Sequence, residues 1–188
     1  MAFGQDIKRY FGNRFEDANL SNILLRPDQH ELIWKWIKQP THFLIFLGIP
    51  GCGKTYTSIA ITLYLYKNAL KHGKEDFIKF VPQRIIFEEL KNCINKNWSL
   101  SYILDELDRA LLLTIDDFGA TRNSEWEKEQ MTYIIDRRYV SKKPTIITSN
   151  LSLNEISEIY HPRVADRLGA SENLIITEWN CSLRKDGY

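Results

Sequence analysis

The sequence predicts an α/β fold in which a parallel sheet lies between two layers of helices. Three observations support this prediction. A glycine-rich loop follows an apolar run and precedes a long helical pattern; several apolar runs show no polar alternation, as is typical of strands buried on both faces; and these runs alternate with helical patterns. Ligands of such sheets bind at the carboxyl ends of the strands. We therefore expect the functional residues at those ends.

The composition is that of one ordinary globular domain. The chain has 188 residues, of which 44% are hydrophobic and 26% charged, with a net charge of +1, so any nucleic-acid site must be a local patch. Three widely spaced cysteines form no C-x-x-C pair, which argues against a disulfide framework or zinc site and fits a reducing cytosol. The opening residues lack the apolar core of a signal peptide, and the apolar runs are too short to span a bilayer. We expect a cytoplasmic protein without a membrane partner.

The first half of the chain predicts two helices and one strand. Arg14–Asn22 reads as an irregular lead-in, and Pro27–Ile37 as a helix that begins at its proline and has apolar residues at helical spacing. The apolar run His42–Leu47 is the expected first strand. Thr55–Lys71 is expected to be a helix that ends near Gly73, because glycine commonly follows a helix end.

The second half follows from the same two patterns. A polar passage, Asn95–Tyr102, interrupts it. The expected helices are Gln83–Asn95 and Glu125–Val140, and the expected strands are Phe77–Val81, Ala110–Asp117, Pro144–Asn150 and Leu174–Trp179.

The segment Gly48–Thr55, GIPGCGKT, matches the phosphate-binding pattern G-x-x-x-x-G-K-[ST] in full. Its glycines let backbone N–H groups surround an anion, Lys54 would reach the β- and γ-phosphates, and the Thr55 hydroxyl would bind Mg²⁺. The position between a strand and a helix disfavours a chance glycine-rich turn. We therefore predict ATP and Mg²⁺ as cofactors and expect the Lys54 head group to face solvent or ligand. The predicted nucleotide-binding residues are Gly48, Pro50, Gly51, Cys52, Gly53, Lys54, Thr55 and Tyr56.

Two further strand ends carry candidate residues. The strand in LLLTIDDFG would deliver Asp116 to hold Mg²⁺ through water and Asp117 to orient the attacking water. The alternative is a strand that ends in an acidic turn. Asn150 would hydrogen-bond the γ-phosphate or the water, or it would cap a helix over Leu153–Ile159. The strand Phe77–Val81 lies between loop and acids in sequence, which is typical of ATPases in which an extra strand separates the two.

Arg163 and Arg167 lie four residues apart and so share one helix face. Arginine suits γ-phosphate recognition because it is forked and permanently charged. The alternative is two solvated arginines near Asp166 and Glu172. If the arginine is supplied by a neighbouring subunit, hydrolysis requires a homo-oligomer.

Three blocks together resemble a known family: GIPGCGKT, the segment Leu111–Asn150, and HPRVADRL (His161–Leu168). They are similar to the AAA+ ATPase core of the DnaC/DnaI bacterial replicative helicase loaders, with IstB-type transposition ATPases as relatives. The resemblance runs from Arg14 to the C-terminus. It implies a P-loop NTPase of the AAA+ type with a parallel five-stranded sheet. The implied roles are Walker A for Lys54 and Thr55, Walker B for Asp116 and Asp117, sensor 1 for Asn150, and trans-acting finger for Arg167 with Arg163 as its companion.

The chain departs from this family in four places. Asp116–Asp117 stands where many relatives have Asp-Glu, so we expect slow hydrolysis. Cys52 replaces a small or hydroxyl residue, and we interpret it as a packing substitution rather than a redox switch. The chain ends about ten residues after its last predicted strand, which predicts a short or absent lid. We divide the chain into a lead-in, 1–13, and an AAA+ core, 14–188, so a helicase-gripping module does not precede the core.

Single-stranded DNA is a further partner that the family implies. The candidate segment Gln83–Tyr102 interleaves bases with an aromatic residue, as strand-tracking surfaces do. The alternative is a solvated helix with its tryptophan packed on the core. The candidate residues are Arg84, Lys91, Lys96, Asn97 and Trp98. A second basic stretch, Arg137, Arg138, Lys142 and Lys143, is interpreted as a subunit contact or a solvated helix end.

Three functions remain open on these residues. The first is an ATP-dependent loader that binds single-stranded DNA and assembles on a replicative ring helicase. The second is an IstB-like accessory ATPase of transposition. The third is a non-catalytic factor that docks on a replication protein. A helicase or transposase gene as neighbour separates the first two, and an ATP turnover assay tests the third.

Overall fold

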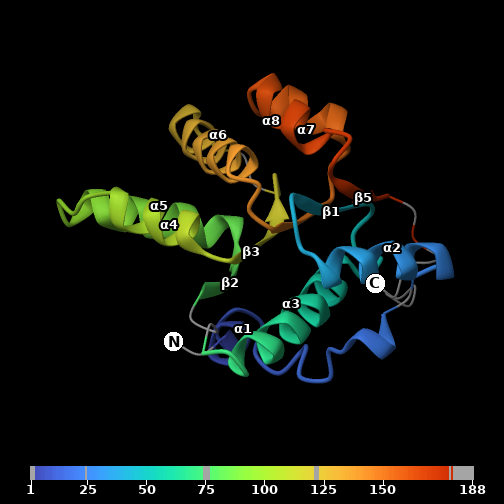
Figure 1. Cartoon of the computed structure of the whole chain (residues 1–188). Coiled ribbons are helices and arrows are strands. Elements are labelled where there is room, and N and C mark those ends of the chain that lie inside the picture. Colours follow the sequence, from blue (N-terminus) through green and yellow to red (C-terminus); the bar gives the residue numbers. More distant parts are fainter. Residues whose placement is uncertain (1–2, 24, 74–76, 121–122, 178, 180–188) are drawn as a thin grey trace, which may run out of the picture.

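The computed structural model describes residues 3–23, 25–73, 77–120, 123–177 and 179. It contains a parallel sheet of five strands in the order β2-β3-β4-β1-β5 (Figure 1). The strands are β1 (Phe43–Leu47), β2 (Ile78–Pro82), β3 (Leu112–Phe118), β4 (Thr145–Ser149) and β5 (Leu174–Ile176). The predicted five-stranded parallel sheet between helices is confirmed.

Helices cover both faces of this sheet, and the β1 residues divide between the two cores (Figure 1). Phe43, Ile45 and Leu47 pack into one core; Leu44 and Phe46 pack into the other. All five are buried, which explains why the strand is apolar without alternation. Helices α1 (Phe3–Phe11), α2 (Pro27–Lys38) and α3 (Lys54–Leu70) cover one face, and α4 (Gln83–Asn95), α5 (Ser101–Arg109), α6 (Glu125–Val140), α7 (Leu153–Ile159) and α8 (Pro162–Leu168) cover the other.

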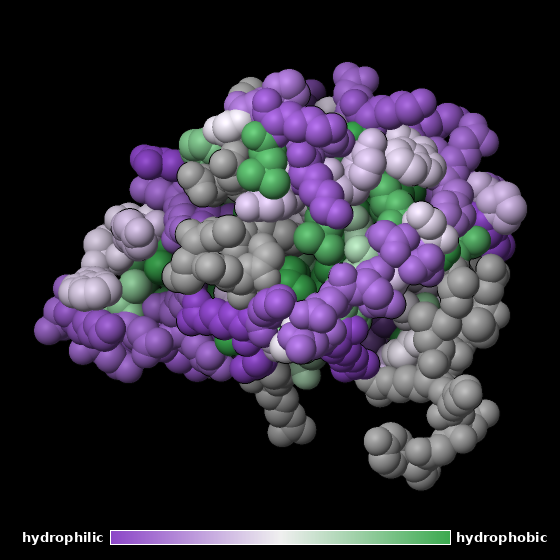
Figure 2. All heavy atoms as spheres, turned by 90° about the horizontal axis from the view of Figure 1, so that it is seen from below, coloured by the Kyte–Doolittle hydropathy of each residue, from purple (hydrophilic) through white to green (hydrophobic). Residues whose placement is uncertain are grey.

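The outer surface of the α1–α3 layer is mixed in character. Figure 2 shows it from below, with apolar side chains in separate patches among polar ones. This is expected of helices whose apolar sides are turned toward a sheet. None of the helices in the described part of the chain is long and apolar enough to cross a membrane.

Two helices were not predicted from the sequence. Helix α1 lies within the lead-in and buries Ile7 in the core shared with α3 and β2. Helix α5 begins inside the predicted polar passage and buries Leu107, with Ile103 and Leu104 beside it. Both have apolar residues at helical spacing over only two turns, which is a weak signal. The last strand is shorter than predicted and ends at Ile176.

The strand between β1 and β3 is β4, whereas β2 lies at the edge of the sheet. The predicted separation is therefore present, but the separating strand comes later in the sequence than Phe77–Val81. Leu47 is level with Ser149 on β4, and Ser149 is level with Phe118 on β3. Three carboxyl ends thus meet, as parallel sheets require of a ligand site.

Arg138 is fully buried, so the interpretation of this residue as a subunit contact or solvated helix end is wrong. Its guanidinium donates to the carbonyl oxygens of Leu107, Ala110 and Pro144 at 2.7, 3.2 and 2.7 Å and to the Thr145 hydroxyl at 2.7 Å. Burial lowers its pKa to about 10. Arg138 therefore ties α6 to β4 and to the end of α5.

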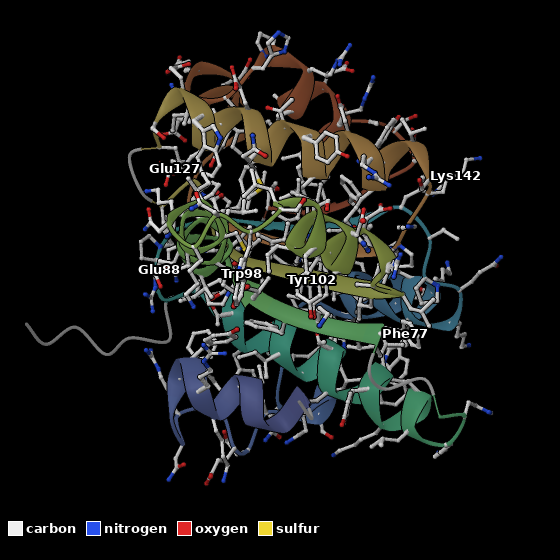
Figure 3. The ribbon with its side chains drawn as sticks, turned by 90° about the vertical axis from the view of Figure 1, so that its left-hand side faces the viewer. Phe77, Glu88, Trp98, Tyr102, Glu127 and Lys142 are labelled. Carbon is white, nitrogen blue, oxygen red and sulfur yellow. The ribbon has the colours of Figure 1, made fainter. Side chains whose placement is uncertain are left out.

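The other bases of that stretch lie at the surface. Arg137 and Lys143 both pair with Asp108, at 2.8 and 3.2 Å. Lys142 is exposed in the turn after α6 (Figure 3). The sequence pattern did not distinguish these solvated bases from the buried Arg138.

Candidate nucleotide-binding site

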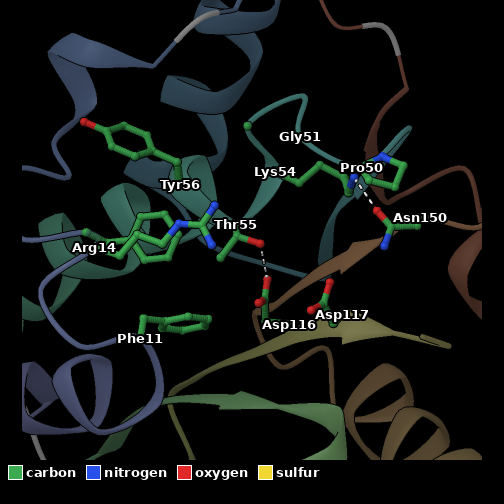
Figure 4. Close-up of a pocket in the computed structure, with 12 residues that line it drawn as sticks. Phe11, Arg14, Pro50, Gly51, Lys54, Thr55, Tyr56, Asp116, Asp117 and Asn150 are labelled. Carbon is green, nitrogen blue, oxygen red and sulfur yellow. Dashed lines mark hydrogen bonds between the residues drawn. The ribbon is translucent and has the colours of Figure 1, made fainter. Parts of the chain in front are cut away.

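A cavity of about 350 Å³ lies where β1, β3 and β4 end and α3 begins (Figure 4). Its walls come from three parts of the chain. The loop and the start of α3 contribute Pro50, Gly51, Gly53, Lys54, Thr55 and Tyr56; the strand ends contribute Asp116, Asp117 and Asn150; and the segment after α1 contributes Phe11, Arg14 and Phe15.

The loop owes its shape to glycines at two positions. Gly51 and Gly53 have φ angles of 84° and 105°, in a region that side chains with a Cβ disfavour. Gly53 also caps the N-terminus of α3, so the free N–H groups of the helix face the cavity. These features form the anion cradle that the motif predicts. Gly48 and Cys52 belong to the loop without lining the cavity, and Cys52 is buried, in agreement with a packing role.

Lys54 is held by the loop itself, so the expectation of a head group facing solvent or ligand is wrong. The side chain is only 5% exposed. Its ammonium donates to the carbonyl oxygens of Gly48 and Ile49 at 2.7 and 2.8 Å and to Asn150 Oδ1 at 2.8 Å. Burial lowers the Lys54 pKa. A phosphate group would compete with these neutral acceptors as a charged and stronger one.

Asp116 and Asp117 face the same cavity because β3 is irregular between them and β4. The register shifts between Ile115 and Phe118, and Asp117 has a left-handed φ of 55°. Consecutive residues of a regular strand point to opposite faces. The irregularity therefore keeps Asp116 buried at the end of α3 while Asp117 is exposed. Its backbone N–H is fixed by the Thr148 hydroxyl at 3.0 Å.

Asp116 has one satisfied oxygen and one free oxygen. Oδ1 accepts from the hydroxyls of Thr148 and Thr55, at 2.7 and 3.0 Å, while Oδ2 is buried without a hydrogen-bond partner. Burial raises the pKa of this carboxyl to about 6. A buried acceptor without a donor, next to a threonine hydroxyl, fits a divalent cation with oxygen ligands. Thr55 and Asp116 are therefore the residues suited to hold Mg²⁺.

Asn150 does not cap α7. Ser152 fills that role, since its side chain accepts from the Glu155 N–H at 3.2 Å and Glu155 returns the bond. The capping alternative for Asn150 is therefore wrong. The carboxamide lies in the cavity beside Lys54, where it could reach a terminal phosphate (Figure 4).

Arg163 and Arg167 lie on α8, away from the cavity walls. Both contact Asp136 on α6, at 3.0 and 3.5 Å, and Arg167 also packs over the Tyr139 ring at 4.9 Å. Arg167 pairs with Asp166 as well, at 3.0 Å, which is part of the solvated alternative. Within one subunit neither arginine lines the nucleotide cavity.

The segment after α1 contributes three wall residues that sequence reasoning missed. Phe11, Arg14 and Phe15 lie opposite the loop (Figure 4). Phe15 makes edge contacts with Phe11 and with Tyr56, at 5.2 and 6.3 Å between ring centres. The only signal in the sequence is a pair of aromatic residues around an arginine, which does not indicate a pocket.

The DNA-binding candidates differ in how available they are (Figure 3). Trp98 is 64% exposed with Lys96 4.9 Å from its ring centre, so the alternative in which this tryptophan packs on the core is wrong. Both line a groove of about 370 Å³ that also includes Tyr102. The other two bases are engaged: Arg84 pairs with Glu88 at 3.3 Å and Lys91 with Glu127 at 2.9 Å.

Comparison with solved structures shows the same fold. The chain superposes on a crystal structure of the DnaC helicase loader with a TM-score of 0.69 and 24% identity, covering 87% of this chain and 98% of that one. For DnaI the TM-score is 0.67 with 22% identity, covering 85% and 91%. For AMPPCP-bound DnaA from Aquifex aeolicus it is 0.70 with 15% identity, covering 86% and 50%. The predicted AAA+ type of P-loop fold is confirmed.

Sequence comparison gives the relatives. The chain is 33% identical over 138 residues to the replicative helicase loader DnaC of Escherichia coli K12, covering 72% of this chain and 54% of that protein. It is 31% identical over 164 residues to the uncharacterized protein YqaM of Bacillus subtilis, covering 81% and 49%. The chain thus spans about half the length of these curated relatives. The family profile of IstB-like ATP-binding proteins matches residues 32–168. With its phosphate loop, acidic strand end and matched profile, the chain belongs to the family of IstB-like ATP-binding proteins.

Proposed function

We propose that this chain is an ATP-dependent switch that loads a replicative ring helicase onto DNA in the cytoplasm. The observation that carries the proposal is the convergence of Lys54, Asp116 and Asn150 on one cavity. The chain in which they converge is 33% identical to a helicase loader over 138 residues. A loader needs such a site because nucleotide state must change its contacts with helicase and DNA.

Each residue of the cavity has a defined task in this proposal. The loop amides and Lys54 hold the phosphates, and Asn150 contacts the terminal one. Thr55 and Asp116 hold Mg²⁺, which neutralises charge on the phosphates. Asp117 orients the attacking water from its exposed position at the end of β3. Asp is one methylene shorter than Glu, so we expect slow hydrolysis.

Turnover in this proposal requires a second copy of the chain. Arg167 lies outside its own cavity, held by Asp136 and the Tyr139 ring. This placement supports a role in trans, at the γ-phosphate of a neighbouring subunit, with Arg163 beside it. ATP would then drive assembly of a homo-oligomer.

Single-stranded DNA binds in this proposal along α4 and α5. Trp98 and Tyr102 are 64% and 72% exposed and offer flat rings for base stacking, with Lys96 as the adjacent cation. Because Arg84 and Lys91 are paired with acids, we expect them to contribute less.

A transposition accessory ATPase is the second candidate, because the matching profile is that of IstB-like proteins. A non-catalytic docking factor is the third. The IstB-like function predicts ATP-dependent binding to duplex DNA and to a transposase. The docking factor predicts binding to a replication protein without ATP turnover.

Co-purification with the replicative helicase of the same organism tests the proposal. A tagged helicase should retain wild-type protein with ATP and retain less of the Lys54→Ala variant. Loading is then measured as helicase-dependent unwinding of a DNA covered with single-strand binding protein. Retention of a cognate transposase in place of the helicase would favour the second candidate, and retention that ignores ATP would favour the third.

A further inference from the structure

Arg14 places a second cation in the nucleotide cavity, from a segment that the phosphate-binding motif does not include. The residue follows α1 and lies in the turns that lead toward Leu20. Its guanidinium points into the cavity, toward Thr55 and Tyr56 at the start of α3 (Figure 4). The side chain is exposed to this space rather than packed in the core.

The hydrogen-bonding capacity of Arg14 is unused. Its guanidinium lies over the ring of Phe15, 5.3 Å from the ring centre. Stacking on a ring orients a guanidinium but occupies none of its N–H donors. Within the described part of the chain no carboxylate pairs with Arg14. Phe15 is in turn fixed by Phe11 and Tyr56, so the cation is held in place without being neutralised.

The two cations of the cavity lie on opposite sides of Thr55 (Figure 4). Lys54 and Asn150 are bonded to each other at 2.8 Å on one side. In a phosphate loop the lysine reaches the β- and γ-phosphates while the amides surround the α- and β-phosphates. A chain of phosphates that begins at Lys54 and passes Thr55 therefore brings its α-phosphate to the side where Arg14 lies.

We propose that Arg14 is a phosphate-binding residue that holds the α-phosphate of the bound nucleotide. The inference rests on the proposed nucleotide-binding function. A guanidinium fork can donate two hydrogen bonds to one phosphate, and its stacking on Phe15 reduces the entropy lost on binding. The segment after α1 then senses any nucleotide, whereas Lys54 and Asn150 distinguish ATP from ADP.

Arg9 provides a matched control for this proposal. It stacks on Tyr10 as Arg14 stacks on Phe15, at 5.7 Å, but it lines the groove beside α4 and α5. Calorimetric titration should show that Arg14→Gln weakens ATP and ADP binding by the same factor, about tenfold to hundredfold, the range of a charge-assisted hydrogen bond. Arg9→Gln should leave both affinities unchanged. Adenosine, which has no phosphate, should compete equally well against both variants.

A chemical measurement on the unmutated chain covers the case in which Arg14→Gln does not fold. ADP should protect Arg14, and not Arg9, from modification by phenylglyoxal, read by mass spectrometry. Unchanged ADP affinity in folded Arg14→Gln, a loss confined to ATP, weaker adenosine binding or an unprotected Arg14 would each overturn the assignment. If the wild-type chain binds no nucleotide at all, the proposed function fails together with it.

Discussion

The nucleotide cavity and the α4–α5 surface both carry cations, but the cations differ in their partners. In the cavity, Lys54 is bonded to neutral oxygens and Arg14 to a ring alone. On the α4–α5 surface, Arg84 and Lys91 are paired with glutamates of the same chain. A cation that meets only neutral groups gains more from a phosphate than one that must first leave a carboxylate. Availability therefore distinguishes the two regions better than the number of basic residues does.

The largest effect should come from the cavity lysine. Lys54→Ala should reduce ATP affinity at least about hundredfold, because it removes a charge-assisted contact with two phosphates. Lys67→Ala, on the exposed side of the same helix, is the control. The measurement is titration with a fluorescent ATP analogue, with circular dichroism to check the fold. Unchanged affinity in a folded variant would mean that the cavity is not the nucleotide site.

The second effect tests whether the cavity is complete within one subunit. Arg167→Ala should retain ATP affinity yet lose turnover by about 10²–10³, less than the 10³–10⁵ of finger arginines elsewhere because the basal rate is expected to be low. Arg167 is also held by Asp136, so the thermal stability of the variant must be checked.

Mixing two inactive variants decides between trans and cis. Lys54→Ala protein still offers Arg167, and Arg167→Ala protein still binds ATP, so the mixture should regain part of the activity. Wild-type turnover per subunit should rise with protein concentration. A mixture that stays inactive, together with concentration-independent turnover, would show that Arg167 acts within its own subunit or only in the fold.

A smaller effect is expected on the α4–α5 surface, and it sharpens the role of availability. Lys96→Ala with Trp98→Ala should weaken single-stranded DNA binding about tenfold, since one stacked base contributes about 1–3 kcal/mol. It should also flatten the salt dependence by about 0.7 for the lost phosphate contact. Arg84→Ala with Lys91→Ala should change both quantities less. Fluorescence anisotropy at several salt concentrations measures them, and equal effects of the two pairs would contradict the comparison.

The smallest effect concerns the pH dependence of stability. Burial raises the Asp116 pKa from 3.8 to about 6, so the folded chain binds this proton more tightly than the unfolded chain does. The free energy of unfolding should therefore fall as pH rises from about 4 to about 6. Asp116→Asn removes that contribution and should be more stable than wild type at pH 7.5, without Mg²⁺, by on the order of 1 kcal/mol.

Urea denaturation of both proteins at pH 5 and pH 7.5 measures this difference. Asp117→Asn is the control, because that side chain is exposed. Mg²⁺ should stabilise the wild type and not Asp116→Asn. A variant that is less stable than the wild type at both pH values would refute the account of Asp116 as a buried carboxylate awaiting a cation.

Sequence reasoning predicted the elements with strong local patterns and missed those with weak ones. The five strands and the helix after the loop were found because buried strands are uniformly apolar and glycines mark the loop. Helices α1 and α5 were missed because two turns of apolar spacing do not stand out from a polar segment. The same holds for the site: the loop and the acids form a motif, whereas Phe11, Arg14 and Phe15 do not.

By itself the sequence determined the sheet, the phosphate loop and the acidic strand end, because backbone conformation and burial leave periodic and local traces in the residues. Only the tertiary structure decided what each charge meets. It buried Arg138 under four oxygen acceptors, paired Lys91 with Glu127, left Asp116 Oδ2 without a partner, and brought Arg14 to the cavity. Partners of this kind come from distant parts of the chain, and the energy of a charge depends on those partners and on its burial.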